Sequence, residues 1–167
     1  MRSKIVTPPL LILSLLVLGC GGGASGPTAP SIDTVGNIES KSYGLVNTSR
    51  LNTGLNQLQL DGALSQVARV HSRDMSAREF FSHTNPDGQS LKQRLEAQGY
   101  RVLAAAENIA QVHNATNPAQ FAHNLLLENI VHRQNIMNER FILVGVGAER
   151  RGNTVWITQV FAVPARG

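Results

Sequence analysis

Three residues of this chain have the side-chain types and apolar surroundings of a chemical site. His83 follows two phenylalanines and a serine, Glu107 lies among alanines, and His132 starts the polar run His-Arg-Gln-Asn. Two imidazoles and a carboxylate could hold a zinc ion and leave one coordination position open for water or substrate. Without a metal, the same groups could exchange a proton near neutral pH, because histidine titrates there. The three residues are far apart in sequence, so the site requires the chain to fold back on itself.

Each of the three also has a structural interpretation. His83 could cap backbone groups of the turn that follows it, and His132 could be a surface residue of a helix. A carboxylate at Glu107 would be costly to bury without a partner, which a histidine, a metal ion or a neighbouring loop would supply. We favour a cleft role for all three. We expect the adjacent Asn108 to hold backbone rather than to do chemistry.

Other reactive side chains are few. Ser82 and Thr84 flank the first histidine, but nearness in sequence does not establish the geometry of a Ser-His pair. We expect His71 to be a core histidine, because the other residues of its helical face are apolar. We expect His113 and His123 to be exposed, since the sequence shows no partner for either.

Helices must position most of these groups. The sequence predicts a short first helix that ends at Gly54 and a second that starts after Asp61, a typical N-cap. Apolar residues follow Asp61 at the spacing of one helical face. The inward-facing residues of this helix are Leu64, Val67, Ala68, His71 and Met75. Ser90 is expected to cap a short helix that stops at Gly99. Asn117 and Pro118 predict the start of another helix, and residues 128–137 a further helical piece that carries His132.

Strands supply the remaining support. Residues 100–105 are extended in character and lead to Glu107. Residues 142–148 and 155–161 are rich in β-branched and aromatic residues, and a turn at 150–153 joins them as a hairpin. Helices therefore precede a hairpin, which predicts an α+β fold with helices packed on an antiparallel sheet.

Several short motifs occur in a fixed order along the chain. They are His-Ser-Arg-Asp-Met at 71–75, Phe-Phe-Ser-His at 80–83, Ala-Glu-Asn-Ile-Ala at 106–110, His-Arg-Gln-Asn-Ile at 132–136, Val-Gly-Val-Gly at 144–147, and Trp156, Gln159 and Phe161. This series resembles the bacterial branch of the CAP superfamily, also called SCP/Tpx-1/Ag5/PR-1 or the SCP domain. The resemblance spans roughly residues 44–163.

The resemblance implies an α-β-α sandwich with a broad cleft, lined by two histidines and two acidic residues and sometimes holding a divalent metal. His83 matches the first histidine, Glu107 the acidic residue of a Glu-Asn motif, and His132 the second histidine. These three are the candidate catalytic and metal residues, and zinc is the first candidate metal.

The fourth position departs from the family pattern. Leu126 stands where relatives have tryptophan, and Asn129 stands where they have glutamate or serine. Glu128 is adjacent but need not face the same way. Asn129, Glu128 and Asn108 are therefore secondary cleft candidates.

The N-terminal residues indicate export. A basic start is followed by an apolar run over residues 5–18 and by Val-Leu-Gly-Cys at 17–20, the layout of a secretory signal. The last four residues resemble a bacterial lipobox, in which Cys20 becomes the lipid-modified first residue and carries acyl chains such as palmitate. The alternative is an ordinary cleaved signal with a chance cysteine. Cys20 is the sole cysteine, so no disulfide can form within the chain.

The predicted organisation is a lipoprotein signal peptide at 1–19, a lipid-anchored flexible linker at 20–43 and the CAP/SCP domain at 44–165. The linker prediction rests on its Gly, Pro and Ser content and its few large apolar residues. This places the domain in the bacterial cell envelope, attached to a membrane by its lipid, and to the outer membrane if the host is Gram-negative. The chain has a net charge of +4 but no Lys/Arg run or basic stripe, so a nucleic-acid partner is not expected.

Three functions are consistent with these residues. We rank first a binding module whose cleft holds a small apolar ligand, lipid or peptide, with or without a divalent metal. A metal-assisted envelope hydrolase, most plausibly a peptidase, is second, because no nucleophile is evident. A non-catalytic surface interaction protein is third.

Overall fold

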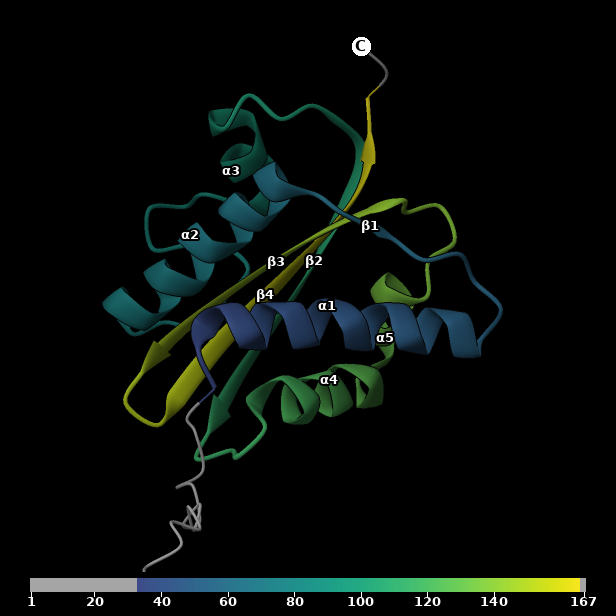
Figure 1. Ribbon diagram of the computed structural model, residues 1–167. Helices are drawn as coiled ribbons and strands as arrows, with labels where there is room; N and C mark the ends of the chain where they lie inside the picture. Colours follow the sequence, from purple (N-terminus) through teal and green to yellow (C-terminus); the bar gives the residue numbers. More distant parts are fainter. Residues whose placement is uncertain (1–32, 166–167) are drawn as a thin grey trace, which may run out of the picture. The chain divides into compact units, whose positions relative to one another are not determined.

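The computed structural model describes residues 33–165, which form five helices and four strands (Figure 1). The helices are α1 (Val35–Asn52), α2 (Gly62–Arg78), α3 (Leu91–Ala97), α4 (Pro118–Glu128) and α5 (Ile130–Ile136). The strands are β1 (Gln59–Leu60), β2 (Val102–His113), β3 (Leu143–Arg151) and β4 (Thr154–Pro164). They form one sheet in the order β1-β3-β4-β2. β4 pairs antiparallel with both β2 and β3, while the two-residue β1 pairs parallel with β3 and makes the sheet mixed.

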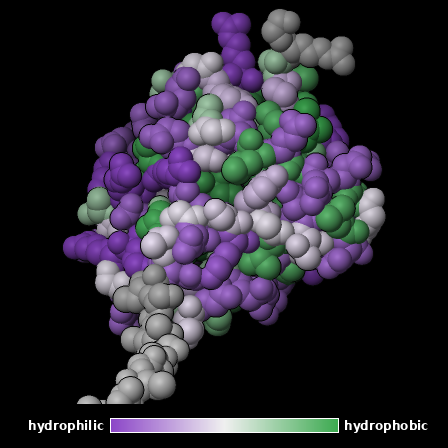
Figure 2. Space-filling model, in the orientation of Figure 1, coloured by the Kyte–Doolittle hydropathy of each residue, from purple (hydrophilic) through white to green (hydrophobic). Residues whose placement is uncertain are grey.

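The helices cover both faces of the sheet, which confirms the predicted α+β sandwich (Figure 1). On one face α2 packs over β3 and β4 and α3 lies beside β2, and their core contains Leu64, Leu95 and Val160. On the other face α1, α4 and α5 bury a larger core that includes Ile136 and Phe161. The face shown in Figure 2 is mostly polar, with apolar side chains in separate patches.

Local sequence explains where the helices start. The Asp61 side chain accepts a hydrogen bond from the Leu64 backbone N–H at 2.8 Å and caps α2. Ser90 and Gln93 form a capping box at α3, which satisfies two backbone donors reciprocally. Asn117 caps α4, and the proline after it occupies the first turn. All three predicted helix starts are confirmed.

Two glycines let α2 lie directly on β3. A Cβ atom added at Gly145 would lie 2.2 Å from the Leu64 backbone carbon, and one at Gly147 would lie 2.1 Å from the Arg69 backbone nitrogen. No side chain fits in such a space. The alternation in Val-Gly-Val-Gly follows from this, because Val144 and Val146 face the core on the opposite side of the sheet.

The first helix differs from its prediction. α1 begins at Val35, inside the segment assigned to a flexible linker, and the Thr34 side chain caps it by accepting from the Asn37 N–H at 3.2 Å. Ile38 is fully buried, so this part of the chain belongs to the folded domain. The helix is polar apart from a few inward residues, and its composition alone therefore resembled a linker. The signal peptide, Cys20 and the rest of the linker lie outside the described residues.

His123 also differs from its prediction. It was expected to be exposed, but it is buried between α4 and α1, where its Nε2 lies 2.8 Å from the Ser49 hydroxyl. The partner comes from a helix far away in sequence and could not be inferred locally. His113 is exposed, as predicted. Among residues 33–165, no helix is long and apolar enough to cross a membrane.

Candidate functional site

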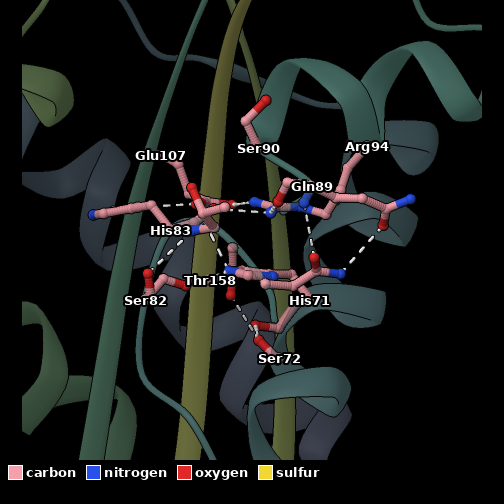
Figure 3. Close-up of polar contacts among 12 residues, drawn as sticks. His71, Ser72, Ser82, His83, Gln89, Ser90, Arg94, Glu107 and Thr158 are labelled. Carbon is pink, nitrogen blue, oxygen red and sulfur yellow. Dashed lines mark hydrogen bonds and ion pairs between the residues drawn. The ribbon is translucent and has the colours of Figure 1, made fainter. Parts of the chain in front are cut away.

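Glu107 lies in the middle of β2, and its side chain is 3% exposed. Its Oε1 accepts a hydrogen bond from His83 Nδ1 at 2.9 Å, and its Oε2 accepts one from Arg94 Nη2 at 2.5 Å (Figure 3). Burial of the carboxylate is thus compensated by an arginine as well as by the predicted histidine. Sequence reasoning missed Arg94. The sequence did contain a clue to this role. Arg94 lies on the same short helix as Leu91 and Leu95, which pack in the core, and a charge in such a place needs a partner.

Arg94 also holds the segment that carries His83. Its Nη1 donates to the His83 carbonyl at 2.9 Å and to the Gln89 carbonyl at 3.0 Å, and its side chain is 6% exposed. The guanidinium presents its donors in a rigid fork, so one side chain can bind the carboxylate and the backbone together. Arg94 therefore connects α3, β2 and the turn after His83.

His71 supports the same segment from α2. It is fully buried, as predicted, and its Nε2 lies 2.9 Å from the Ser82 carbonyl oxygen, to which it donates (Figure 3). Burial, the largest influence, lowers the pKa of His71, so the ring is neutral at pH 7. The carbonyls of Ser82 and His83 are therefore both bound by buried side chains, which fixes the backbone on either side of the His83 Cα.

His83 itself is open to solvent and faces His132. Its side chain is 52% exposed, and the two imidazole centroids are 6.2 Å apart with the rings tilted by 58°. His132 is partly buried near the start of α5. Burial first and the nearby His83 second lower the pKa of His132. The fold thus brings His83, Glu107 and His132 together.

Asn108 and Asn129 position the helix that carries His132. Asn108 Nδ2 donates to the His132 carbonyl at 3.1 Å, so its structural role is as expected. Asn129 caps α5, because its Oδ1 accepts from the Val131 and His132 N–H groups at 3.0 and 3.2 Å. Glu128 is exposed at the end of α4.

The hydrogen bonds define which atoms are free for chemistry. A carboxylate only accepts, so His83 Nδ1 carries the proton, and a neutral His83 keeps its lone pair on Nε2. Both oxygens of Glu107 already have partners, and among the described residues no three His, Cys, Asp or Glu side chains are grouped as a metal cluster. Metal binding by His83, Glu107 and His132 stays a prediction. The Ser82 hydroxyl, which flanks His83 in the sequence, contacts backbone: it accepts a hydrogen bond from the Thr84 N–H at 3.2 Å.

Comparison with known proteins places this chain in a family. Residues 43–161 match the model of the CAP, or cysteine-rich secretory protein, family. YkwD of Bacillus subtilis, an uncharacterized protein, is 33% identical over 132 residues, which are 79% of this chain and 49% of YkwD. The chain therefore spans about half the length of this relative.

Solved structures share the fold. An extracellular SCP-domain protein from Bacillus anthracis superposes with a TM-score of 0.68 at 29% identity, over 77% of this chain and 41% of that protein. The structure of NaASP2 with Zn2+ has a TM-score of 0.50 at 12% identity, over 86% of this chain and 83% of NaASP2. The family match covers most of the described residues, and the fold and the order of the site segments agree with it. The chain is a member of the CAP family of cysteine-rich secretory proteins.

Proposed function

We propose that this CAP domain is an exported, lipid-anchored binding module whose His83–His132 pair binds a divalent metal ion, with zinc as the first candidate, and with it a small ligand, lipid or peptide. One observation carries the proposal. His83 is half exposed, yet its ring is oriented by the Glu107 carboxylate, which is buried and paired with Arg94. A solvent-facing imidazole held by a buried ion pair is arranged for binding rather than for packing.

The two imidazoles suit a metal ion. Zinc binds histidine nitrogens at about 2.0–2.1 Å. The two ring centroids are 6.2 Å apart, so both imidazoles could bind one ion after a small movement of their side chains. His132 is neutral at pH 7 because its pKa is lowered, and a neutral imidazole is the form that binds metal. Glu107 would act through His83, as carboxylates often do beside metal-bound histidines. A bound zinc ion would supply a Lewis-acidic position for an oxygen or nitrogen atom of the ligand.

The location is inferred from sequence and similarity. Residues 1–20 have the signal and lipobox pattern described above, and the similar protein from Bacillus anthracis is extracellular. We infer that this domain lies outside the cytoplasm, held at the envelope by Cys20. The related NaASP2 was crystallised with Zn2+, which makes zinc a reasonable first probe.

The proposal includes no turnover. Within residues 33–165, no serine or threonine hydroxyl hydrogen-bonds the His83 or His132 ring, so no side chain at the site is an activated nucleophile. The hydrolase alternative would need a metal-bound water as its nucleophile, a requirement that binding alone does not have. The interaction-protein alternative does not require the oriented histidines. Binding at the histidine pair therefore explains the site best.

Zinc titration tests the proposal directly. Isothermal calorimetry of the purified chain should show about one zinc site, and His83→Ala or His132→Ala should each abolish it. Glu107→Gln should weaken binding by about 10–100-fold, the usual effect of removing a group that orients a metal-bound histidine.

His113→Ala is the matched control. His113 is exposed at the far end of β2 and contacts Thr154, so its loss should leave zinc binding unchanged. Equal zinc binding by the wild type and both cleft-histidine variants would refute the proposed site.

A further inference from the structure

A pocket that contains neither histidine of the pair lies at the segment that leads to His83. It has a volume of about 410 Å³ and lies where the end of α2 and the segment after it meet β2 and β4. Phe80 and Phe81 line it and directly precede Ser82 and His83. Sites for small molecules commonly have volumes of about 300–1,000 Å³. The pocket is therefore large enough for a ligand of its own.

Aromatic side chains form much of its wall. Phe81 is 49% exposed and Trp156 is 7% exposed, while Phe80 is partly buried against the cluster of Met75, Ile109 and Trp156. Exposure of half of a phenylalanine side chain is unfavourable in water. A ligand with an apolar face would remove that surface from water by lying against the Phe81 ring.

The pocket's charged groups are already paired, and so is the Thr154 hydroxyl, which lies 2.9 Å from His113 Nδ1, whereas three other neutral polar groups are free. Arg151 donates to Glu79 at 3.1 Å and to the Ser76 carbonyl at 3.2 Å. Gln111 lies directly opposite Trp156 in the β2–β4 pairing. Within residues 33–165, the Ser76 hydroxyl, the Gln111 amide and the Trp156 indole N–H make no hydrogen bond to another group. Together they offer neutral donors and acceptors.

We propose that this pocket binds one ring of a neutral sugar. A pyranose ring has an apolar C–H face that matches an aromatic side chain and hydroxyls that both donate and accept hydrogen bonds. The free groups of Ser76, Gln111 and Trp156 meet the second requirement. The Glu79 carboxylate in the pocket lining would repel an anionic ligand, and an apolar peptide side chain would leave the neutral polar groups without partners.

The inference goes beyond the metal and ligand binding proposed for the histidine pair. Glu107 and Gln111 lie on the same face of β2, four residues apart, which corresponds to about 13 Å along a strand. A chain of two or more joined sugars held at Phe81 could therefore extend towards His83. Sugar binding at the pocket does not itself require a metal.

The chain's single tryptophan reports on this pocket. Intrinsic fluorescence of the purified chain should change saturably on titration with triacetylchitotriose or maltotriose, two neutral trisaccharides. Phe81→Ala and Gln111→Ala should each weaken binding by about tenfold, equivalent to about 1.4 kcal/mol. Circular dichroism of each variant checks that it is folded. Phe81 is exposed, so its removal is not expected to disturb the fold.

Phe121→Ala is the matched control, because Phe121 is 52% exposed on α4 and lies outside the pocket. It should bind the sugar like the wild type. Zinc titrations in parallel separate the two sites, since His83→Ala should lose zinc and keep the sugar, while Phe81→Ala should do the reverse. No saturable change with either trisaccharide, unchanged affinity in Phe81→Ala, or tighter binding of a sulfated trisaccharide or a phenylalanine-rich peptide would overturn the inference.

Discussion

Arg94 is the residue on which the geometry of the histidine pair most depends. It pairs with a carboxylate that is 3% exposed and is itself 6% exposed. Removing one member of a buried ion pair is more damaging than removing both, because the remaining charge is left without compensation. Arg94 also binds the His83 carbonyl, so its loss would free the backbone that presents the imidazole. Stability and ligand binding should therefore depend on the same side chain.

We predict that Arg94→Met lowers the free energy of unfolding by about 3–5 kcal/mol, measured by urea denaturation. The double variant Arg94→Met with Glu107→Gln should recover part of this loss, because no unpaired charge then remains. Arg94→Lys should retain the charge but lose the fork, so the ¹⁵N shifts of the His83 ring should differ from those of the wild type. A purely structural role for Arg94 would leave those shifts unchanged.

Lys92→Met provides the control on the same helix. Lys92 is 82% exposed, and its ion pair with Glu96 spans 3.8 Å at the surface. Exposed pairs of this kind contribute little, so stability should not change measurably. A loss equal to that of Arg94→Met would show that α3 responds to any substitution and would contradict the specific role of Arg94.

At the level of elements, the contact between α2 and β3 determines where the site forms. α2 carries His71, and it can approach β3 this closely because Gly145 and Gly147 have no side chain. We predict that Gly145→Ala or Gly147→Ala each costs about 3 kcal/mol, the upper part of the usual range for overpacking, since the added methyl group meets backbone that cannot rotate away. Thermal unfolding monitored by circular dichroism measures the loss.

Gly44→Ala is the matched glycine control. Gly44 lies inside α1 with nothing within 4 Å of an added Cβ, and alanine favours a helix over glycine by about 0.5–1 kcal/mol. This variant should be as stable as the wild type or more stable. Destabilisation of Gly44→Ala comparable to that of Gly145→Ala would remove close packing as the explanation.

Sequence predicted the elements whose signals are local and missed those that depend on distant partners. Asp61, Ser90 and Asn117 cap their own helices, so their positions could be inferred from a few neighbouring residues. β1 could not, because two residues form a strand only when β3 lies beside them. The start of α1 was missed for a similar reason, since Ile38 is buried by elements far along the chain.

The site shows the same division. The motifs around His83, Glu107 and His132 could be found from residue types, and the fold brings all three together. The partners of Arg94 and of the buried His123 could not be assigned, because Glu107 and Ser49 lie on other elements. Side-chain pairing across layers is set by tertiary packing, which a single sequence does not display.

At the level of the whole molecule, the anchor proposed at Cys20 would connect the folded domain to a membrane through the residues that precede α1. The apolar run at 5–18 ends in Gly19-Cys20, and lipidation would attach the chain at that cysteine. Stable anchoring needs more than one acyl chain, which a lipoprotein cysteine provides. We predict that Cys20→Ser shifts the protein from the membrane fraction to the soluble fraction of a bacterial host and abolishes incorporation of labelled palmitate.

A relocated cysteine separates lipidation from a general effect of the thiol. Cys20→Ser combined with Ser25→Cys restores one cysteine but moves it away from the Val-Leu-Gly sequence that precedes position 20. This variant should remain soluble and unlabelled, since the modification depends on the cysteine's position and not on its presence. Because residues 33–165 contain no helix able to cross a membrane, membrane association that persisted in both variants would have to come from another part of the chain or from a bound partner, and the anchor at Cys20 would be refuted.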